Sequence, residues 1–353
     1  MPWKDKPLIP KDVSGSLRAE RSNLPLSEGL LRHSAPRNDE MPSSAVPSLI
    51  LIVGPTAVGK TALSIRLAER FGGEILSADS RQIYRGMNIG TAKAAPEERA
   101  RVPHHMLDII SPDEWYTVAQ FQDAAMKTIA DIHARGRLPF LVGGSGLYVR
   151  AIAEGLQIPR VPPAPELRAE LTAEAGPSPD ILYARLKSLD PDAAARIDPR
   201  NVRRVIRALE VCLLTGEPIS AQQVKLPPAL RMLWIGLTLP RPELYRRIDE
   251  RTERMVQLEL VEEVRRLAAQ GYSWDAPAMT GVGYRQISVY LRGECSLEDA
   301  VREIRRATRR FVRQQYNWFR LDDPRIHWLN SDESAEAEAA RLVRAFLVSS
   351  EEG

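Results

Sequence analysis

Residues Gly54–Thr61 have the composition and spacing of a phosphate-binding loop. They read Gly-Pro-Thr-Ala-Val-Gly-Lys-Thr, which fits the GxxxxGK[ST] pattern. Glycines let backbone N–H groups approach phosphate oxygens, Lys60 supplies a positive charge, and the Thr61 hydroxyl can hold Mg²⁺. We therefore expect a phosphate compound to bind to Gly54, Pro55, Thr56, Ala57, Val58, Gly59, Lys60 and Thr61, with Thr61 as the metal ligand. The alternative is a glycine-rich turn that carries Lys-Thr by chance.

The carboxyl group of Asp79 is the candidate for proton transfer. Asp79 follows an apolar run, and in open parallel sheets the carboxyl ends of strands line the ligand crevice. ATPases and GTPases of this type place an acid at a strand end to hold Mg²⁺. Here the run Leu138–Val142 continues into glycines, and Met232–Leu239 contains no acid. Asp79 is therefore placed as a base, although position alone leaves a helix N-cap or turn residue equally open.

The elements around these residues alternate between short apolar runs and helical patterns. Four runs are typical of buried parallel strands, namely Leu49–Val53, Glu74–Ala78, Leu138–Val142 and Met232–Leu239. Helical spacing is found in Ala62–Arg70, Trp115–Arg135, 241–270 and 297–320. The alternation predicts an α/β fold in which a P-loop-containing parallel sheet is flanked by helices.

Changes in composition divide the chain. Prolines at 159–165 and 227–228 bracket an Ala-, Arg- and Leu-rich helical stretch. We expect an all-helical insertion at 157–228, between the core segments 48–156 and 229–330. Residues 1–47 are expected to be a disordered leader, or to precede a true start at Met41, and residues 331–353 an acidic C-terminal tail with a peripheral helix.

Composition restricts the class of protein. Two cysteines among 353 residues exclude a disulfide scaffold and a four-cysteine zinc site, so we expect a reducing, cytoplasmic location. No apolar run reaches the length of a membrane helix, so no membrane association is expected. His104 and His105 lack spaced partners for a metal site.

Several motifs in series resemble the tRNA dimethylallyltransferases. They are the phosphate loop, Ser77–Met87, Ile89–Lys93, Pro103–Asp108, Leu141–Tyr148, Arg203–Glu210 and Gly281–Gln286. The resemblance runs from Leu49 to Leu329. It implies transfer of a dimethylallyl group from dimethylallyl diphosphate to N6 of adenosine 37, beside the anticodon of tRNAs that read codons starting with U. The loop would then hold a diphosphate leaving group.

The resemblance also implies roles for single residues. Asp79 would accept the N6 proton. Lys60, Thr61, Mg²⁺ and an arginine would neutralise the leaving group. Arg251 occupies the place of that arginine, and Arg247, one helical turn away, is the alternate. Ser145 matches a Ser/Thr that touches the substrate.

The implied substrate is the anticodon stem-loop of tRNA, whose target base must leave the stack. Ser80, Arg81 and Gln82 match a base-contacting stretch beside Asp79, and the Gln82 amide could pair with a base edge. Further matching positions are Ser145, Arg168, Arg203, Arg204, Val205, Ile206, Arg207, Thr280, Gly281, Val282, Gly283, Tyr284 and Arg285. Arginines at 302, 305, 306, 309, 310 and 313 share one helical face suited to phosphates, opposite Val301, Ile304, Phe311, Val312 and Trp318. We expect a monomer.

Three other functions remain open. An adenylate dimethylallyltransferase would act on free nucleotide, a P-loop small-molecule kinase would bind ATP, and a non-catalytic RNA-binding protein could retain a vestigial loop. The helical insertion and the arginine-rich helices favour tRNA over the first two. Asp79 together with Lys60 and Thr61 speaks against the third. Two cysteines also exclude the C-terminal zinc finger of eukaryotic relatives, so a bacterial-type enzyme is implied.

Overall fold

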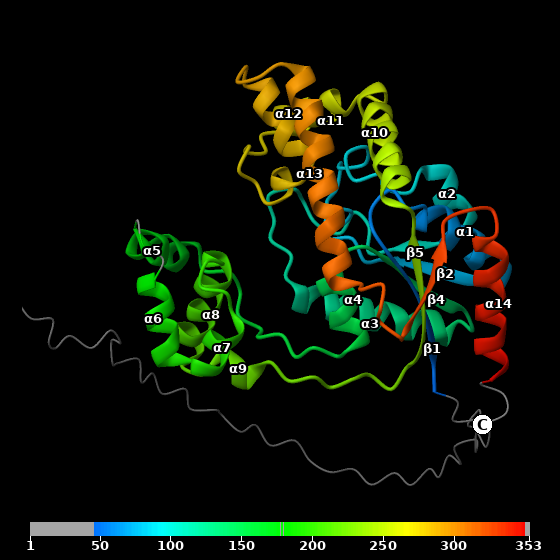
Figure 1. Cartoon of the computed structure of the whole chain (residues 1–353), viewed down its shortest axis with the longest axis horizontal. Coiled ribbons are helices and arrows are strands. Elements are labelled where there is room, and N and C mark those ends of the chain that lie inside the picture. Colours follow the sequence, from blue (N-terminus) through cyan, green and yellow to red (C-terminus); the bar gives the residue numbers. More distant parts are fainter. Residues whose placement is uncertain (1–45, 177, 179, 350–353) are drawn as a thin grey trace, which may run out of the picture. The chain divides into compact units, whose positions relative to one another are not determined.

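A six-stranded parallel sheet forms the centre of the computed structural model, which describes residues 46–176, 178 and 180–349 (Figure 1). The strands are β1 (Ser48–Val53), β2 (Gly73–Ser77), β3 (His104–His105), β4 (Leu138–Gly143), β5 (Arg231–Thr238) and β6 (Ile326–Asn330), in the order β3-β2-β4-β1-β5-β6. β1 is central, and its Ile50 aligns with Phe140 of β4 and Leu233 of β5. The predicted α/β class is confirmed, and the four apolar runs are four of the six strands.

Helices cover both faces of the sheet because alternate side chains of each strand point to opposite sides. Ile50 and Ile52 pack on the side of α1 (Lys60–Phe71), α10 (Arg241–Gln257) and α14 (Ala335–Val348). Leu49 and Leu51 pack on the side of α3 (Val118–Ala134) and α4 (Gly146–Ala153). A short helix, α2 (Pro96–Arg101), precedes β3.

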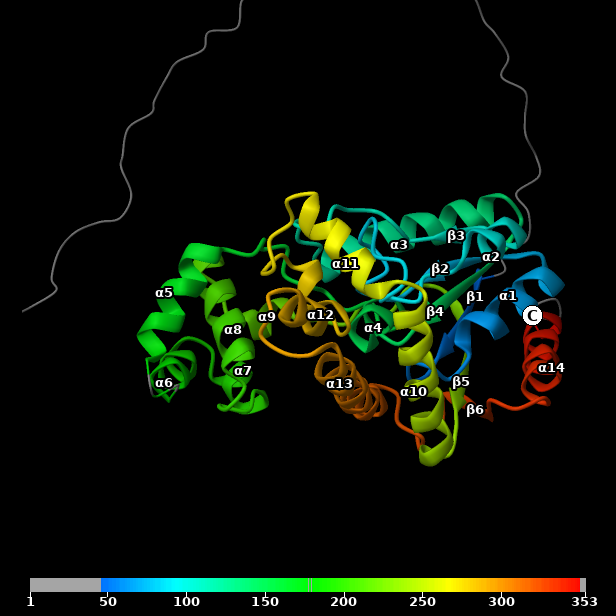
Figure 2. The same cartoon turned by 90° about the horizontal axis from the view of Figure 1, so that it is seen from above.

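A third core joins the loop after β2 to helices from much later in the chain. It combines Ile83 and Met87 with α11 (Leu260–Ala269), the 3-10 helix η1 (Ala278–Thr280), α12 (Tyr284–Leu291) and α13 (Leu297–Trp318). Figure 2 shows α13 beside α10. The loop that carries Asp79 is therefore packed against the C-terminal half of the chain.

Residues between α4 and β5 form a helical bundle with its own core. The bundle contains α5 (Pro165–Ala175), α6 (Asp180–Leu189), α7 (Pro191–Arg196), α8 (Val202–Thr215) and α9 (Ile219–Gln222). Its core includes Leu182, Leu186 and Leu209. The incoming and outgoing segments meet in an antiparallel bridge between Leu156 and Lys225.

The C-terminal segment differs from the expectation of an acidic tail. β6 adds an edge strand, and α14 packs against α1 through Ala335, Ala339, Ala340 and Val343. These small apolar residues share one helical face, while the acids face solvent, so 331–349 completes the core. The expected leader and Met41 fall in residues 1–45, outside the described part. No helix in the described part is long and apolar enough to cross a membrane.

Candidate active site

The phosphate loop runs from the end of β1 into α1. Gly54 has φ +135°, and a Cβ there would lie 2.3 Å from the Leu237 carbonyl oxygen, so only glycine lets the loop pass β5 this closely. Lys60 begins α1, and its Nζ donates to the Pro55 carbonyl at 2.7 Å across the loop. Within the described residues the Thr61 hydroxyl has no hydrogen-bond partner, which leaves it available to a metal or a phosphate.

Asp79, Lys60 and Arg251 interact electrostatically from three different elements. Burial lowers the pKa of Lys60 to about 8, while the Asp79 charge raises it and the Arg251 charge lowers it further. Burial also lowers the pKa of Arg251, against the opposing effect of Asp79. In the described part of the chain, the Arg251 guanidinium makes no hydrogen bond or ion pair. Two cations thus stand near one carboxylate, with capacity left for an anion.

Arg247 is held differently. Its Nε donates to Glu243 at 3.0 Å, and its Nη2 donates to the Ser331 carbonyl at 3.2 Å. Because the Arg247 guanidinium already has these partners, Arg251 is the better candidate for a leaving-group contact. The assignment remains a prediction.

The turn after β2 presents Asp79 and is fastened to the turn after β4. One Asp79 oxygen accepts the Arg81 backbone N–H at 2.8 Å, and the other has no hydrogen-bond partner in the described ranges. The Ser145 hydroxyl accepts the Ser80 backbone N–H at 3.0 Å, and the Ser145 N–H donates to the Ala78 carbonyl at 3.3 Å. The free Asp79 oxygen can accept a proton.

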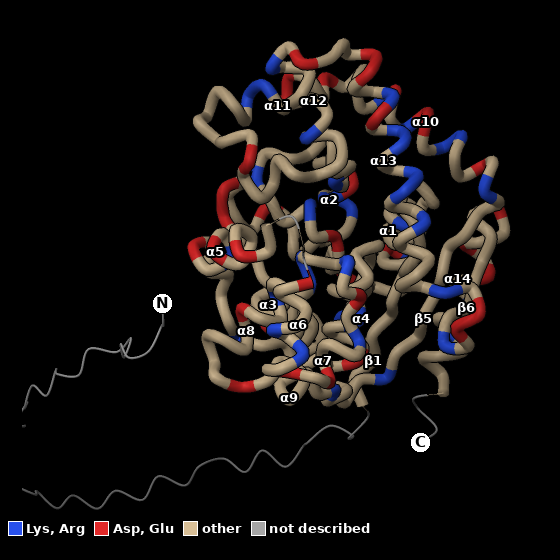
Figure 3. The backbone as a smooth tube through the Cα atoms, turned by 60° about the vertical axis from the view of Figure 1, so that its left-hand side comes forward, with Lys and Arg blue, Asp and Glu red and all other residues tan. Residues whose placement is uncertain are grey.

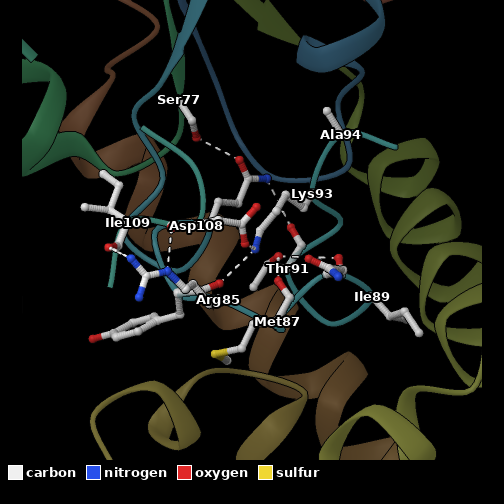
Figure 4. Close-up of polar contacts among 12 residues, drawn as sticks. Ser77, Arg85, Met87, Ile89, Thr91, Lys93, Ala94, Asp108 and Ile109 are labelled. Carbon is white, nitrogen blue, oxygen red and sulfur yellow. Dashed lines mark hydrogen bonds and ion pairs between the residues drawn. The ribbon is translucent and has the colours of Figure 1, made fainter. Parts of the chain in front are cut away.

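The amide of Gln82 is already satisfied inside the fold. Its Oε1 accepts from the Ser77 hydroxyl at 2.7 Å, and its Nε2 donates to the Thr91 and Ala92 carbonyls at 3.3 Å each (Figure 4). Pairing of this amide with a base edge would replace these internal bonds, and it stays a prediction. The Arg81 guanidinium also has a partner within the fold, because its Nη1 donates to the Pro277 carbonyl at 2.8 Å.

Further polar contacts, including the ion pair between the buried Lys93 and Asp108, fix the rest of this loop. The Lys93 ammonium donates to the Tyr84 carbonyl at 2.8 Å and to Asp108 at 2.6 Å, and Arg85 binds the Asp108 and Ile109 carbonyls at 3.1 and 2.8 Å (Figure 4). Such contacts hold the loop without regular secondary structure, since its polar groups find partners within it.

Glu263 of α11 binds backbone groups of the same loop. Its buried carboxylate accepts backbone N–H groups of Asn88, Ile89 and Gly90 at 2.8–3.1 Å and the Tyr284 hydroxyl at 2.5 Å. Burial and the Glu263 charge raise the pKa of Tyr284 well above its ordinary value. The Tyr284 side chain is thus held in the interior, and its contact with tRNA stays a prediction.

The other expected tRNA contacts divide into buried and exposed positions. Val205 and Ile206 belong to the core of the helical bundle, so their side chains face its interior. Arg168 and Arg207 both bind the buried Glu210, at 2.7 and 2.5 Å. Gly281 and Gly283 are buried, whereas Arg203, Arg204, Thr280, Val282 and Arg285 are exposed.

Arginines recur along α13, seen as the blue segments of this helix in Figure 3. With α10 they form a groove of about 440 Å³, lined by Tyr245, Asp249, Arg302, Arg305, Arg306, Arg309 and Arg313. Arg309 pairs with Asp249 at 2.6 Å and Arg305 with Glu253 at 2.7 Å, so part of the positive charge is neutralised by α10. Phe311, expected on the inner face, is 39% exposed.

Sequence reasoning missed two buried polar residues, Glu263 and Gln315. Their side chains bind backbone groups of loops that are distant in sequence. The available signal was a polar residue in phase with apolar ones, because Glu263 lies three positions after Leu260 and Gln315 three after Val312.

Comparisons with known proteins agree with this geometry. The IPP transferase family profile matches residues 82–322, and an isopentenyl transferase profile matches residues 47–111. The tRNA dimethylallyltransferase of Roseiflexus sp. is 54% identical over 303 residues, covering 85% of this chain and 98% of that protein.

Two solved structures are also similar. The tRNA isopentenylpyrophosphate transferase of Bacillus halodurans has a TM-score of 0.64 and 41% identity, covering 86% of this chain and 98% of its own. A eukaryotic dimethylallyltransferase described as acting on tRNA has a TM-score of 0.71 and 26% identity, covering 86% and 78%. By family profile, sequence identity and fold, the chain belongs to the IPP transferase family, the family of the tRNA dimethylallyltransferases.

Proposed function

We propose that this protein transfers a dimethylallyl group from dimethylallyl diphosphate to N6 of adenosine 37 in tRNAs that read codons starting with U. The observation that carries the proposal is the grouping of Asp79, with one free carboxylate oxygen, beside Lys60 and Arg251. A base and two cations at one phosphate loop suit a reaction that loses a proton from one partner and a diphosphate from the other. The family membership supports the same reaction.

The proposed reaction is a displacement, and the residues of the site can take up its proton and stabilise its leaving group. Adenine N6 attacks C1 of the dimethylallyl group, the bond from C1 to the diphosphate oxygen breaks, and the diphosphate leaves with that electron pair. The N6 proton passes to the free oxygen of Asp79. Lys60 and Arg251 neutralise the charge that develops on the leaving group, which a half-buried site makes more effective than in water.

Mg²⁺ fits the site through one protein oxygen. The Thr61 hydroxyl has no hydrogen-bond partner among the described residues, and no cluster of three or more His, Cys, Asp or Glu in those residues could hold a metal. Thr61 would hold the ion, and the other ligands would be diphosphate oxygens and water. When bound, Mg²⁺ adds positive charge at the leaving group.

The strand ends argue against a kinase. The neighbours of the phosphate-loop strand end at Gly143 in β4 and Thr238 in β5, and neither supplies the acid that P-loop kinases and ATPases place there. Asp79 lies one strand further out, after β2. The exposed Arg203, Arg204 and Arg285 favour a nucleic acid over free adenylate. We expect a monomer that acts in the cytoplasm, where its free cysteines, Cys212 and Cys295, stay reduced.

The test incubates the purified protein with unmodified tRNA that carries A36-A37-A38, Mg²⁺ and labelled dimethylallyl diphosphate. Parallel reactions contain the same tRNA with A37 replaced, free AMP in place of tRNA, or labelled ATP. We expect label in tRNA only when A37 is present. Label in AMP, or phosphate transferred from ATP without prenyl transfer, would contradict the proposal.

A further inference from the structure

Gln315, near the end of α13, connects two loops of the candidate site. Its side chain is 4% exposed. Its Oε1 accepts the Thr56 backbone N–H at 2.8 Å, and its Nε2 donates to the Gly144 carbonyl at 3.0 Å. A neutral amide can accept at one end and donate at the other, which neither a carboxylate nor an ammonium can do.

The turn after β4 is shaped to receive this side chain. A Cβ at Gly144 would lie 2.1 Å from the Gln315 Nε2, and a Cβ at Gly146 would lie 2.2 Å from the Trp318 ring. The backbone of the turn therefore lies directly against the end of α13. The glycines at these two positions are required by close approach, and Gln315 forms one side of that contact.

The helix that carries Gln315 is anchored at both ends. Ala300 and Ile304 belong to the core beneath the loop after β2, whereas Val312 belongs to the core on one face of the sheet. Because α13 is fixed in two cores, Gln315 holds its two partners at a set separation.

The two partners belong to opposite halves of the site. Thr56 lies in the phosphate loop, and its N–H is bonded to Gln315 of α13. Gly144 precedes Ser145, whose hydroxyl holds the residue after Asp79. One route of hydrogen bonds thus runs from the phosphate loop through Gln315, Gly144 and Ser145 to Ser80.

We propose that Gln315 is a positioning residue that sets the separation between the diphosphate loop and the turn that supports Asp79. The inference rests on the proposed function. A displacement requires N6, C1 and the leaving diphosphate oxygen in line, with the base within reach of the N6 proton, and misplacement by about 1 Å can lower the rate by about 10²-fold. Because Gln315 is buried and both ends of its amide bind backbone groups, its effect should fall on the chemical step and not on binding.

The test compares Gln315→Met, which keeps the length and removes both polar ends, with Gln315→Glu, which keeps the acceptor for Thr56 and replaces the donor to Gly144. Gln314→Met, at the exposed neighbouring position, is the matched control. The measurements are the single-turnover rate at saturating tRNA and donor, the Kd for tRNA, the Kd for inorganic pyrophosphate, and the Tm. We expect both Gln315 variants to lose about 10²-fold in rate with each Kd within about threefold of the wild type.

A change at Gly144 tests the same contact from its other side and leaves Gln315 in place. Gly144→Ala places a Cβ against the Gln315 Nε2, which forces the turn and the amide apart while Gln315 itself is kept, so it should lower the rate in the same way. The double variant Gly144→Ala/Gln315→Met should be no slower than the slower single variant, since both changes break one connection. If Gln315→Met fails to fold, Gln315→Glu and Gly144→Ala carry the comparison.

Two results would overturn the inference. One is a Gln315→Met protein with the wild-type rate. The other is a rate loss that saturating donor restores in step with a weaker pyrophosphate Kd, which would confine Gln315 to the phosphate loop. A wild-type protein that does not label tRNA would instead contradict the proposed function, so the two failures are distinguishable.

Discussion

The hydroxyl of Ser145 accepts a hydrogen bond from the backbone N–H of Ser80 at 3.0 Å. This contact joins the turn after β4 to the residue that follows Asp79. β4 lies between β1 and β2, so its end reaches both the phosphate loop and the turn after β2. The middle strand of the three carries no catalytic acid and instead supports both halves of the site.

Replacement of Asp79 tests its role as the base. Asp79→Asn keeps the shape and the acceptor for the Arg81 N–H but cannot take up the N6 proton at the free oxygen. We expect the transfer rate to fall by at least about 10²-fold, while tRNA binding, measured by filter retention, stays unchanged. Asp113→Asn, at an exposed acid, is the control. An unchanged rate would remove Asp79 as the base.

The lowered pKa of Lys60 predicts that the affinity for diphosphate depends on pH. Because burial lowers its pKa to about 8, Lys60 loses its charge in the free protein as the pH rises through 8, whereas a bound anion favours the charged form. Pyrophosphate affinity, measured by calorimetry, should therefore decrease from pH 7 to 9.5, with proton uptake on binding above pH 8. Lys60→Met should bind weakly and lack this proton uptake.

The lowered pKa of Lys60 also makes the free energy of unfolding depend on pH. The folded protein releases the Lys60 proton near pH 8, whereas the unfolded chain keeps it until about 10.5. Between these values the unfolded state binds more protons, so the contribution of Lys60 to the free energy of unfolding rises with pH. Urea titrations of the wild type and Lys60→Met should differ in slope with pH in that window, and parallel curves would contradict the shift.

The two arginines of α10 should respond differently to substitution. Arg251→Gln removes a cation with no hydrogen bond or ion pair within the described residues, so the rate at saturating substrates should fall by about 10²-fold. Arg247→Gln loses its contacts to Glu243 and Ser331, and we expect a smaller effect, mainly on Tm. Steady-state kinetics with both variants decides between them, and the reverse order would reassign the leaving-group arginine.

The basic face of α13 should act through tRNA phosphates. Arg306 and Arg310 are exposed, so Arg306→Ala/Arg310→Ala should weaken tRNA binding and reduce the slope of log K against log[salt] by about 2, without changing the rate at saturation. The control is Arg341→Ala/Arg344→Ala on α14. An unchanged salt dependence would mean that Arg306 and Arg310 do not contact tRNA phosphates.

α14 should be essential to stability. Ala339 is fully buried against the core, and Ala339→Glu places a charge there, which should lower the free energy of unfolding by roughly 2–4 kcal/mol. Ala337→Glu, at an exposed position of the same helix, should change it by less than about 0.5 kcal/mol. Denaturant unfolding of both variants tests whether 331–349 belongs to the core, and equal stability would contradict it.

The sequence by itself determined the local elements and the family. Apolar runs such as Leu138–Val142 and the glycines around Lys60 depend on short-range patterns, which report burial and backbone conformation directly. β6 and α12 were missed, since strand β6 gains its place from pairing with β5 and α12 from packing on α11. Tertiary contacts override weak local signals of this kind.

Only the tertiary structure decided which polar side chains are free to act. Neighbouring residues give no sign that the Gln82 amide is occupied, that Tyr284 is bound to Glu263, or that Arg251 has no hydrogen-bond or ion-pair partner among the described residues. The reason is that hydrogen-bond satisfaction is settled by groups far apart in the chain. Gln315 and Thr56 are 259 positions apart and meet only when α13 packs against the end of the sheet.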